Sequence, residues 1–410
     1  MPYRGLWIWW NDRLARRPRW LNVLMLLAAF MTVIYVPWDL FMKPVCHDEQ
    51  VWLGIVFRGW AAKLVTIPHW AIWAALWYGL WHMRSWLWPW AAIYSAQVTF
   101  SMVVWPLVYV GGLRGVLSAI VAGIAFGAVT RALWNLRDRL EAPPPPLRER
   151  YGEWSLVTGA SSGIGAEMAR ALARQGMSVV LVARRDDRLR AMAAELEEAH
   201  GVATRVVAAD LSDPGGVEEV VHAVADLEIA VLVNNAGFGM AGRFDGQDPA
   251  ALQRMVQLNC ATPALLTNRL IAGMLARGRG AVIIVGSVAG HQPVPFNGVY
   301  GATKAFDLHF GEMLWAELQG TGVDALVLEP GPTETEFQAV AGESAHEGES
   351  PARVVAVALD ALGHRPSVVS GWRNWLMANV IRFVPRSLTA LIAGGVMAQW
   401  VPAERLAPRR

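Results

Sequence analysis

The sequence predicts two regions of different fold class: an all-α transmembrane region of about four spans, followed by an α/β region with a doubly wound parallel sheet. Sixteen of the 21 tryptophans precede residue 140, and indole rings favour membrane interfaces. The proline run Pro143–Pro146 then interrupts the chain, because a helix cannot continue through it. After Tyr151, short apolar runs alternate with helical ones, which indicates parallel strands covered by helices.

The composition is typical of a membrane protein and argues against two kinds of function. Hydrophobic residues make up 54% of the 410 residues and charged residues only 17%, which is more apolar than a soluble protein. The net charge of +2 gives no basis for nucleic-acid binding. Cys46 and Cys260 fall in different regions, so we expect neither a disulfide framework nor a metal site.

The transmembrane prediction rests on four apolar stretches, each about long enough to cross a hydrocarbon core of roughly 30 Å. They are Trp20–Trp38, Leu64–Trp81, Trp86–Val110 and Leu113–Trp134. No small-residue cleavage pattern follows the first stretch, so an uncleaved span is preferred to a signal peptide. The apolar but partly basic segment Val51–Lys63 is either a surface-lying helix or part of another span. His47-Asp48-Glu49 is expected to be a solvated loop.

Two glycine spacings in this region allow close helix contact, namely Gly111/Gly115 and Gly123/Gly127. Packing within one chain is the preferred interpretation, and a homodimer interface is the alternative. The predicted boundaries are a transmembrane domain at 1–140, a Pro-rich linker at 141–150, an α/β domain at 151–345 and a C-terminal helical extension at 346–410.

Six strands are predicted in the α/β domain, and ligands of such sheets bind beyond the carboxyl ends of the strands. They are Trp154–Thr158, Ser178–Ala183, Thr204–Ala208, Val231–Val233, Ala281–Val285 and Val323–Leu328. The first strand runs into the glycine-rich segment Thr158–Gly165, which opens a helix. Gly159 permits the tight turn, while Gly163 and Gly165 let the backbone approach a pyrophosphate at the helix N-terminus. This context predicts a Rossmann-type dinucleotide-binding fold.

With this glycine motif the chain resembles the short-chain dehydrogenase/reductase family, over about half of its length. The further matching motifs, in chain order, are Asn234-Asn235-Ala236-Gly237 after the fourth strand, Asn259 in the next helix, Ser287 after the fifth strand, Tyr300 and Lys304, and Pro330-Gly331-Pro332-Thr333-Glu334-Thr335 after the sixth strand. The resemblance implies an enzyme that transfers a hydride between a nicotinamide cofactor and a carbonyl or alcohol.

The candidate catalytic residues are Asn259, Ser287, Tyr300 and Lys304. Tyr300 and Lys304 are four apart and therefore share a helix face. A free tyrosine has a pKa near ~10, and a neighbouring ammonium is expected to lower it, so that Tyr300 acts as general acid or base. The resemblance implies that Lys304 binds the nicotinamide ribose, that Ser287 binds the substrate oxygen and that Asn259 holds a water in the proton relay.

The end of the second strand predicts NADP(H) rather than NAD(H). Arg184 stands there, with Arg185 as a second candidate, and guanidinium suits the 2′-phosphate of NADP. Asp186 and Asp187 lie close by, so NAD(H) is the less favoured alternative. The motifs and the resemblance together imply cofactor contacts from Gly159, Ser161, Ser162, Gly163, Ile164, Gly165, Arg184, Arg185, Asp210, Leu211, Asn234, Ala236, Gly237, Tyr300, Lys304, Pro330, Gly331, Thr333 and Thr335.

Two segments after the sixth strand are expected near the substrate or the membrane. The resemblance places a substrate-covering segment at Glu334–Ser350, whose glutamates disfavour an acidic substrate group. From Trp372, aromatic and aliphatic residues alternate with arginines. This indicates an amphipathic helix at a membrane surface or, alternatively, a helix packed on the globular domain.

The leading functional hypothesis is a membrane-anchored oxidoreductase of lipid metabolism, acting on a hydrophobic or lipid-like carbonyl or alcohol. Basic residues at the N-terminus and around 131–150 predict that both ends of the membrane block, and hence the catalytic domain, lie on the cytoplasmic face. One alternative is the same chemistry on a small soluble ketone. Another is a non-catalytic NADP-binding regulatory or scaffold protein, which the Asn259/Ser287/Tyr300/Lys304 set disfavours.

Overall fold

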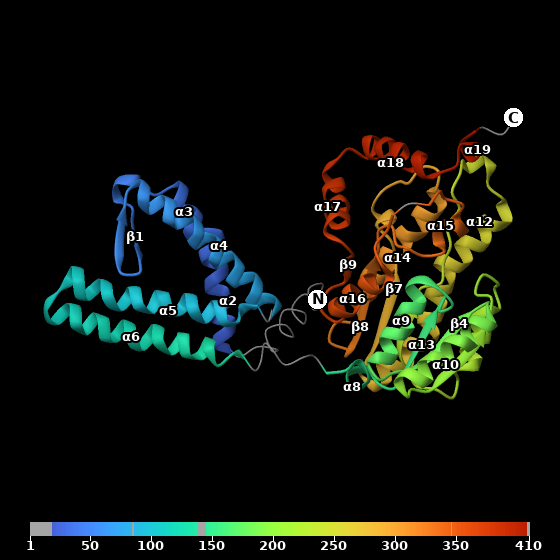
Figure 1. The fold of residues 1–410 in the computed structure, drawn as a ribbon, viewed down its shortest axis with the longest axis horizontal. Helices are drawn as coiled ribbons and strands as arrows, with labels where there is room; N and C mark the ends of the chain where they lie inside the picture. The colour runs from blue at the N-terminus through green and yellow to red at the C-terminus, as the bar shows by residue number, and fades with distance from the viewer. Residues whose placement is uncertain (1–18, 84–85, 138–144, 346, 408–410) are drawn as a thin grey trace. The chain divides into compact units, whose positions relative to one another are not determined.

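The computed structural model describes residues 19–83, 86–137, 145–345 and 347–407 (Figure 1). The chain divides into two compact units at the bond between Pro144 and Pro145. We call them the N-terminal unit and the α/β unit, and each is described by itself. Residues 141–144 of the predicted Pro-rich linker lie outside the described residues, and its second half begins the short helix α8 (Leu147–Tyr151).

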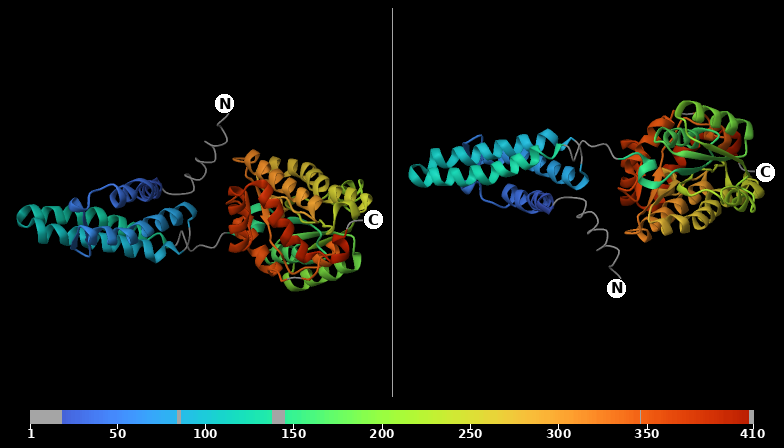
Figure 2. Two further views of the ribbon diagram at one scale, coloured as in Figure 1. Left: turned by 90° about the horizontal axis from the view of Figure 1, so that it is seen from above. Right: turned by 90° about the horizontal axis from the view of Figure 1, so that it is seen from below.

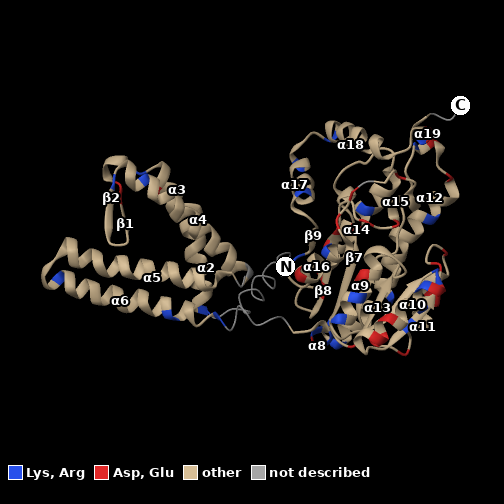
Figure 3. Ribbon diagram, viewed as in Figure 1, with Lys and Arg blue, Asp and Glu red and all other residues tan. Residues whose placement is uncertain are grey.

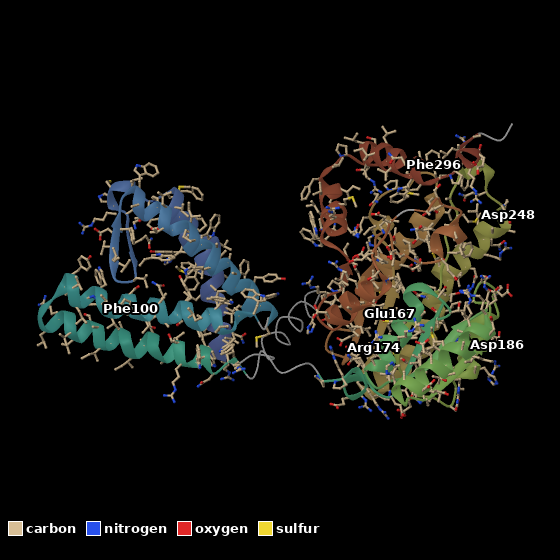
Figure 4. The ribbon with its side chains drawn as sticks, in the orientation of Figure 1. Phe100, Glu167, Arg174, Asp186, Asp248 and Phe296 are labelled. Atoms are coloured by element: carbon tan, nitrogen blue, oxygen red, sulfur yellow. The ribbon has the colours of Figure 1, made fainter. Side chains whose placement is uncertain are left out.

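The N-terminal unit is mainly helical. Its elements are α2 (Arg19–Phe30), η1 (Met31–Tyr35), α3 (Val36–Phe41), η2 (Val45–His47), β1 (Glu49–Trp52), β2 (Ile55–Arg58), α4 (Trp60–His82), α5 (Leu87–Trp105), η3 (Pro106–Val110) and α6 (Gly112–Trp134). In Figure 4 its side chains are almost all carbon, including the exposed Phe100 on α5.

Three helical stretches among the described residues are long and apolar enough to cross a membrane: Arg19–Phe41, Leu87–Val110 and Gly112–Trp134. α4 has a similar length of 23 residues and contains five tryptophans and two histidines, but it is not one of these three. The predicted count of four spans is therefore not confirmed.

The segment Val51–Lys63 is not a surface-lying helix: most of it belongs to the antiparallel hairpin of β1 and β2, and only its last residues, Trp60–Lys63, belong to the long helix α4. The expectation of a solvated loop is wrong for Asp48, which is only 1% exposed. Its carboxylate oxygens lie 3.0 Å from the Nζ atoms of Lys43 and Lys63. These two ammonium groups stabilise the buried carboxylate. The pairing could not be read from the sequence, because the two lysines lie on opposite sides of Asp48 in the chain.

Close contact between α5, η3 and α6 involves two of the four glycines singled out from the sequence. A Cβ atom on Gly115 would lie 2.5 Å from the Pro106 carbonyl oxygen, and one on Gly123 would lie 3.3 Å from Val103 Cγ2. Gly111 and Gly127 have open space around them. Gly115 and Gly123 thus serve packing within the chain.

The α/β unit is built on a seven-stranded, all-parallel sheet of order β5-β4-β3-β6-β7-β8-β9. Its strands are β3 (Trp154–Thr158), β4 (Ser178–Ala183), β5 (Thr204–Ala208), β6 (Ile229–Asn234), β7 (Gly280–Val285), β8 (Val323–Glu329) and β9 (Ser367–Val369). The predicted Rossmann-type fold is confirmed, with the six predicted strands in place. The seventh strand, β9, is not predicted from the sequence.

Helices cover both faces of this sheet (Figure 2). One layer consists of α8 (Leu147–Tyr151), α9 (Gly163–Arg174), α10 (Asp186–His200) and α16 (Pro351–Ala361), and the other of α11 (Gly216–Ala223), α13 (Thr262–Arg277) and α14 (Gly298–Glu317). The strands are rich in Val, Ile and Leu because both of their faces are buried. α9 buries Met168 and Leu172, while Arg174 donates to Glu167 on its outer face at 2.7 Å (Figure 4).

The remaining elements lie near the carboxyl ends of the strands. They are η4 (Phe244–Gly246), α12 (Pro249–Val256), η5 (Gln257–Ala261), η6 (Val288–His291), α15 (Phe337–Ala341), α17 (Trp372–Val380), η7 (Ile381–Phe383), α18 (Arg386–Trp400) and α19 (Ala403–Leu406). α12 begins where the Asp248 carboxylate accepts from the backbone N–H groups of Ala250 and Ala251, as helix N-caps do (Figure 4).

Replacing Gly311 in α14 by alanine should destabilise the α/β unit, although alanine favours helices by about 1 kcal/mol over glycine. The added Cβ would overlap Val327 Cγ2 in β8 and lie 3.3 Å from Ile284 Cδ1, and overpacking a core costs about 1–3 kcal/mol. We expect the Gly311→Ala midpoint of thermal unfolding, followed by tryptophan fluorescence in detergent, to fall by a few degrees. Gly298→Ala, in open space at the start of the same helix, is the control. A midpoint for Gly311→Ala at or above that of the control would contradict the packing argument.

Candidate active site

A cavity of about 1320 Å³ lies beyond the carboxyl ends of the central strands. It begins at the loops after β3, β4 and β6, where the strand order reverses, and continues past the ends of β7 and β8. Such a switch point is where open α/β sheets bind ligands. The volume exceeds the ~300–1,000 Å³ of an ordinary small-molecule site, so the cavity has room for two ligands side by side.

The glycine-rich loop between β3 and α9 forms one wall of the cavity. Gly159 has φ +68°, and a Cβ atom there would lie 2.7 Å from Asn235 Nδ2. A Cβ atom on Gly165 would overlap the Gly159 carbonyl oxygen, so Gly165 lets α9 pack against the loop. The cavity is lined here by Ser161, Ser162, Gly163 and Ile164, at the N-terminus of α9. Free N–H groups at a helix N-terminus favour an anion.

The loops after β3 and β6 are tied together by hydrogen bonds. Asn235 Nδ2 donates to the Thr158 carbonyl oxygen at 2.9 Å, and the backbone N–H groups of Asn235 and Ala236 donate to Thr158 Oγ1. Asn235 therefore lines the cavity, together with Ala236 and Gly237. The predicted cofactor contact Asn234 does not line it: its Nδ2 donates to Thr267 Oγ1 of α13 at 3.0 Å.

Both arginines after β4 line the cavity, in different surroundings. The Arg184 side chain is 73% exposed, with Nη1 3.8 Å from Asp210 Oδ2. Arg185 Nη2 donates to the hydroxyls of Ser161 and Ser162 at 2.9 Å, and Nη1 donates to Glu336 Oε2 at 2.8 Å. The sequence favours Arg184 as the phosphate ligand, whereas the structure places Arg185 directly on the glycine-rich loop.

Glu336, in the segment after the Pro-Gly motif, accepts hydrogen bonds from two arginines of this region, Arg185 and Arg188. Hydrogen bonds from Arg188 and Arg185 lower the pKa of the Glu336 carboxyl to about 2. Two guanidinium groups, two serine hydroxyls and a helix N-terminus at one end of a long cavity are the donor set that phosphate groups require, so the residues present fit a dinucleotide.

Most of the other predicted cofactor contacts also lie on the cavity wall. They are Asp210, Leu211, Pro330, Gly331, Thr333 and Thr335. Asp210 Oδ1 accepts from the backbone N–H and the hydroxyl of Ser212. Although burial raises the pKa of Asp210, these hydrogen bonds and Arg184 hold it below its usual value, so Asp210 is ionised at neutral pH.

Tyr300, Lys304 and Ser287 meet farther along the cavity. Tyr300 and Lys304 lie on the same face of α14, with Lys304 Nζ 5.8 Å from the centre of the Tyr300 ring. Ser287 follows β7, and its hydroxyl lies close enough to Tyr300 to act against the raised pKa of the tyrosine hydroxyl; it donates to the Pro330 carbonyl oxygen at 3.4 Å. Ser287 also accepts from the Ala289 backbone N–H at 3.1 Å. A hydroxyl pair of this kind at the end of a cavity can bind one carbonyl or alcohol oxygen.

The lysine is held by a carboxylate that the sequence analysis does not identify. Lys304 Nζ donates to Asp307 Oδ2 at 2.9 Å and to the Val285 carbonyl oxygen at 2.7 Å. Asp307 is 2% exposed, and its Oδ1 has no hydrogen-bond partner among the described residues. Asp307 is one helical turn beyond Lys304 on α14. The spacing Tyr300/Lys304/Asp307 in the sequence therefore could have indicated that this carboxylate pairs with the lysine.

Burial changes the expected acidity of Tyr300. It raises the pKa of the Tyr300 hydroxyl, and the opposing effects of Lys304 and of the Ser287 hydroxyl are smaller. The prediction of a lowered pKa, made from the Tyr300/Lys304 spacing, is therefore wrong in its net direction, although Lys304 acts in the expected sense. Burial by itself lowers the pKa of Lys304, but Asp307 and Tyr300 raise it above its usual value. Lys304 is thus protonated at neutral pH.

The fourth candidate, Asn259, lies in the π-helical turn η5 and is 1% exposed. Its Nδ2 donates to the Phe238 carbonyl oxygen and to Thr303 Oγ1, each at 3.0 Å, and its Oδ1 accepts from the Phe238 N–H. The side chain is therefore engaged in holding the loop after β6 against α14. It does not line the large cavity with Tyr300, but it lines a small pocket beside Lys304 and Asp307, and its role in holding a water stays a prediction.

The far end of the cavity is apolar and is formed largely by the C-terminal segment. α17, η7 and α18 contribute Met377, Val380, Ile381, Val384, Ile392, Ala393, Val396, Met397 and Trp400. The predicted covering segment Glu334–Ser350 contributes Phe337 and Val340, and the Phe337 ring lies 5.1 Å from that of Tyr300. From the sequence, the residues from Trp372 are expected to form a membrane-surface helix or a packed helix, and their place in the site is not predicted.

Comparison with known proteins identifies the family. Residues 153–345 match the short chain dehydrogenase family. The 7beta-hydroxysteroid dehydrogenase of Collinsella aerofaciens is 36% identical over 235 residues, covering 56% of this chain and 89% of that protein. The very-long-chain 3-oxoacyl-CoA reductase of Anas platyrhynchos is 30% identical over 276 residues, covering 64% and 86%.

A solved structure agrees with these matches. The short-chain dehydrogenase from Sphingobium yanoikuyae in complex with NADPH superposes with a TM-score of 0.52 and 32% identity, covering 63% of this chain and all of that one, 100%. The resemblance seen in the glycine, Tyr300/Lys304 and Pro-Gly motifs is thus confirmed over the α/β unit. The chain belongs to the short-chain dehydrogenase family, whose members are oxidoreductases acting on hydroxyl and carbonyl groups.

Proposed function

We propose that this protein is a membrane-anchored, NADP(H)-dependent oxidoreductase that interconverts a carbonyl and a hydroxyl group on a bulky, uncharged, lipid-like molecule. The observation that carries the substrate class is the apolar end of the cavity, where α17 and α18 face Tyr300 with side chains such as Met377, Val396 and Trp400. A small soluble ketone would leave most of that apolar surface uncovered, and burial of apolar surface stabilises a complex by about 25 cal/mol per Å².

The relatives support a bulky substrate without specifying one. One relative is a dehydrogenase of a hydroxysteroid and another a reductase of a very-long-chain 3-oxoacyl-CoA, and both substrates contain large apolar parts. Among the described cavity residues, the arginines Arg184, Arg185 and Arg254 lie at the end with the glycine-rich loop or next to Asp210. The substrate end carries Glu343 instead, which favours an uncharged substrate over a coenzyme A ester.

In the proposed reaction, Ser287 and Tyr300 bind the substrate oxygen from their adjoining hydroxyls. A bound nicotinamide ring supplies or accepts the hydride at the neighbouring carbon. In reduction, the Tyr300 hydroxyl donates its proton to the substrate oxygen, and in oxidation the phenolate removes it. Lys304 stabilises that phenolate, because its ammonium is fixed beside the ring by Asp307 and Val285. Asp307 thus acts as a positioning residue for Lys304.

The cofactor preference is proposed from the cationic cluster at the glycine-rich loop. Arg184 and Arg185 follow β4, where an acidic residue would bind the ribose hydroxyl of NAD. Arg185 would bind a 2′-phosphate after exchanging its contact with Glu336, since it already lies against Ser161 and Ser162. The complex of the Sphingobium yanoikuyae relative with NADPH supports this assignment.

We further propose that the α/β unit lies on the cytoplasmic face. Three long apolar helices support membrane anchoring, and the arginines at both ends of the membrane block support a cytoplasmic location for both ends. That orientation requires an even number of spans, so α4 would be the fourth. Its 23 residues are long enough to cross, and Lys63 is its only acidic or basic residue apart from histidine.

Tyr300→Phe should abolish turnover while leaving cofactor binding intact, because the change removes only the proton donor. We expect the full-length enzyme in detergent to oxidise NADPH with long-chain or polycyclic ketones, and the variant to lose roughly 10²–10⁴-fold in kcat. Tyr151→Phe is the matched control. Tyr151 is also a buried tyrosine, but its hydroxyl donates to Asp324 and it does not line the cavity. Equal turnover by Tyr300→Phe would overturn the mechanism, and faster reduction of short ketones than of long ones would overturn the substrate class.

Replacing the two arginines should change the cofactor preference. Arg184→Ala and Arg185→Ala should each raise the KM for NADPH roughly tenfold, since a hydrogen bond to a charged group contributes about 1.5–3 kcal/mol. The KM for NADH should change little, because NADH lacks the 2′-phosphate. Initial rates with both cofactors check this, with Arg190→Ala, which pairs with Asp186 outside the cavity, as the control. A parallel loss with both cofactors would count against the NADP assignment.

Asp307→Asn should shift the pH profile of alcohol oxidation to lower pH. The Asp307 charge disfavours the Tyr300 phenolate, as does Glu343, whereas Lys304 and the Ser287 hydroxyl favour it. Removing one negative charge therefore lowers the pKa of Tyr300, and the basic form needed for oxidation is reached at lower pH. The measurement is kcat/KM against pH for wild type, Asp307→Asn and the remote, exposed Asp226→Asn. An unchanged profile, or a shift to higher pH, would show that Asp307 does not act through Tyr300.

A further inference from the structure

The C-terminal segment differs in composition from the rest of the α/β unit. Residues 366–403 contain three arginines, Arg373, Arg382 and Arg386, and no Asp or Glu. In Figure 3, α18 is almost free of charged residues, while α9 and α10 carry both signs. No ion pair is formed by these three arginines among the described residues. A basic, otherwise apolar stretch of this length on a charged domain calls for a specific explanation.

Apolar side chains are concentrated on the outside of this segment. Ten of the seventeen exposed large hydrophobic side chains described after Pro145 lie between Trp372 and Val396. We define the C-terminal apolar face as the five exposed side chains that do not line the cavity: Trp372, Trp375, Phe383, Leu388 and Leu391. Phe383 is 88% exposed and Leu391 75%. Soluble monomers seldom leave so many large apolar groups together in water.

The segment is nevertheless fixed on the α/β unit. Ala378, Thr389 and Met397 are buried on its inner side. The Ser344 N–H donates to the Trp400 carbonyl oxygen at 2.7 Å, and the Arg243 N–H donates to that of Arg405 at 3.0 Å. These contacts hold α17 and α18 in place, so the apolar face is a permanent surface of the folded protein.

The apolar face is continuous with the cavity. Five side chains line the cavity and are also exposed: Leu376, Met377, Val380, Ile392 and Val396. They form an apolar rim between the outer surface of α17 and α18 and the space in front of Tyr300. A hydrophobic molecule can thus pass from the outer surface to the catalytic hydroxyls along side chains that are apolar throughout.

A lipid bilayer with anionic headgroups fits this face better than a second copy of the chain. Tryptophan and arginine beside aliphatic residues are typical of helices that lie in the membrane interface. A symmetric dimer through the same face would bring the three arginines together with no acidic partner in the segment. The chain itself limits how far the α/β unit can be from a membrane crossed by α6. Residues 135–146, which join α6 to α8, span at most about 40 Å when extended.

We propose that the C-terminal apolar face docks on the surface of an anionic bilayer and that the substrate enters the cavity from that bilayer over the apolar rim. The docking half stands on the exposed side chains and the arginines alone. The entry half rests on the proposed function, namely a lipid-like substrate. Two separate readouts are therefore required.

Docking is tested with the full-length protein in vesicles of phosphatidylcholine with 30% phosphatidylglycerol. A cysteine at position 383 (Phe383→Cys), in a background with Cys46→Ser and Cys260→Ser, carries an environment-sensitive fluorophore. We expect lipids with a nitroxide near the headgroup to quench this probe. Phe244→Cys, on an exposed phenylalanine in η4 outside the segment, is the control and should stay unquenched. Equal, weak quenching at both positions would overturn docking, as would energy transfer between probes at 383 on two copies.

Entry is tested by the kinetics of Arg382→Glu/Arg386→Glu, which changes no cavity residue. For a long-chain ketone dissolved in the vesicles, kcat/KM should fall roughly fivefold or more per reversed charge, from the usual strength of a basic residue near an anionic surface. For a short water-soluble ketone it should not change. Equal kcat/KM values of variant and wild type for the dissolved ketone would overturn entry from the bilayer. Failure of wild type to turn over any dissolved ketone would instead refute the proposed function, with the quenching result unaffected.

Discussion

The parallel pairing of β3 with β6 is the constraint on which the rest of the α/β unit depends. From this pair the strand order runs outward in both directions, so the loops after β3 and β6 open apart and leave a crevice between them. Thr158 closes the bottom of that crevice with three hydrogen bonds, two from Asn235 and one from the Ala236 N–H. The phosphate-binding loop lies on one side of it, and Ser287 and Tyr300 are reached by continuing along β7 and α14. A shift of this one register would separate the two halves of the site.

Much of this arrangement is visible in the sequence because it is local. Strands buried on both faces read as short apolar runs, and Tyr300 and Lys304 must share a face at a spacing of four. What the sequence did not reveal depends on distant partners. β9 has only three residues and is a strand because β8 pairs with it. In the sequence Asp48 looks like a polar loop residue. In the structure it is buried and forms ion pairs with two lysines that lie 5 and 15 positions away. The apolar residues of α17 and α18 carry no sign of which side faces a cavity.

The catalytic end of the site is a compromise between burial and charge. Cover by α15 and the C-terminal segment partly buries Tyr300, and this burial makes the Tyr300 phenolate harder to form. The Lys304 ammonium opposes that penalty by stabilising the phenolate. Asp307 holds Lys304 in place, but its negative charge cancels part of this stabilisation. Neither interaction can be judged from residue types alone, because burial decides which one dominates. The same reasoning explains why the proximity of Lys304 did not translate into an acidic tyrosine.

The wall made by α17 and α18 is one helix thick, with the cavity on one side and the exterior on the other. Side chains such as Met377 and Val396 therefore have no protein core behind them. A hydrophobic ligand that fills the cavity supplies the packing partners they lack and becomes part of the core while it is bound. Folding of this segment and ligand binding are then thermodynamically linked, so that its resistance to unfolding grows with the logarithm of ligand concentration above the Kd.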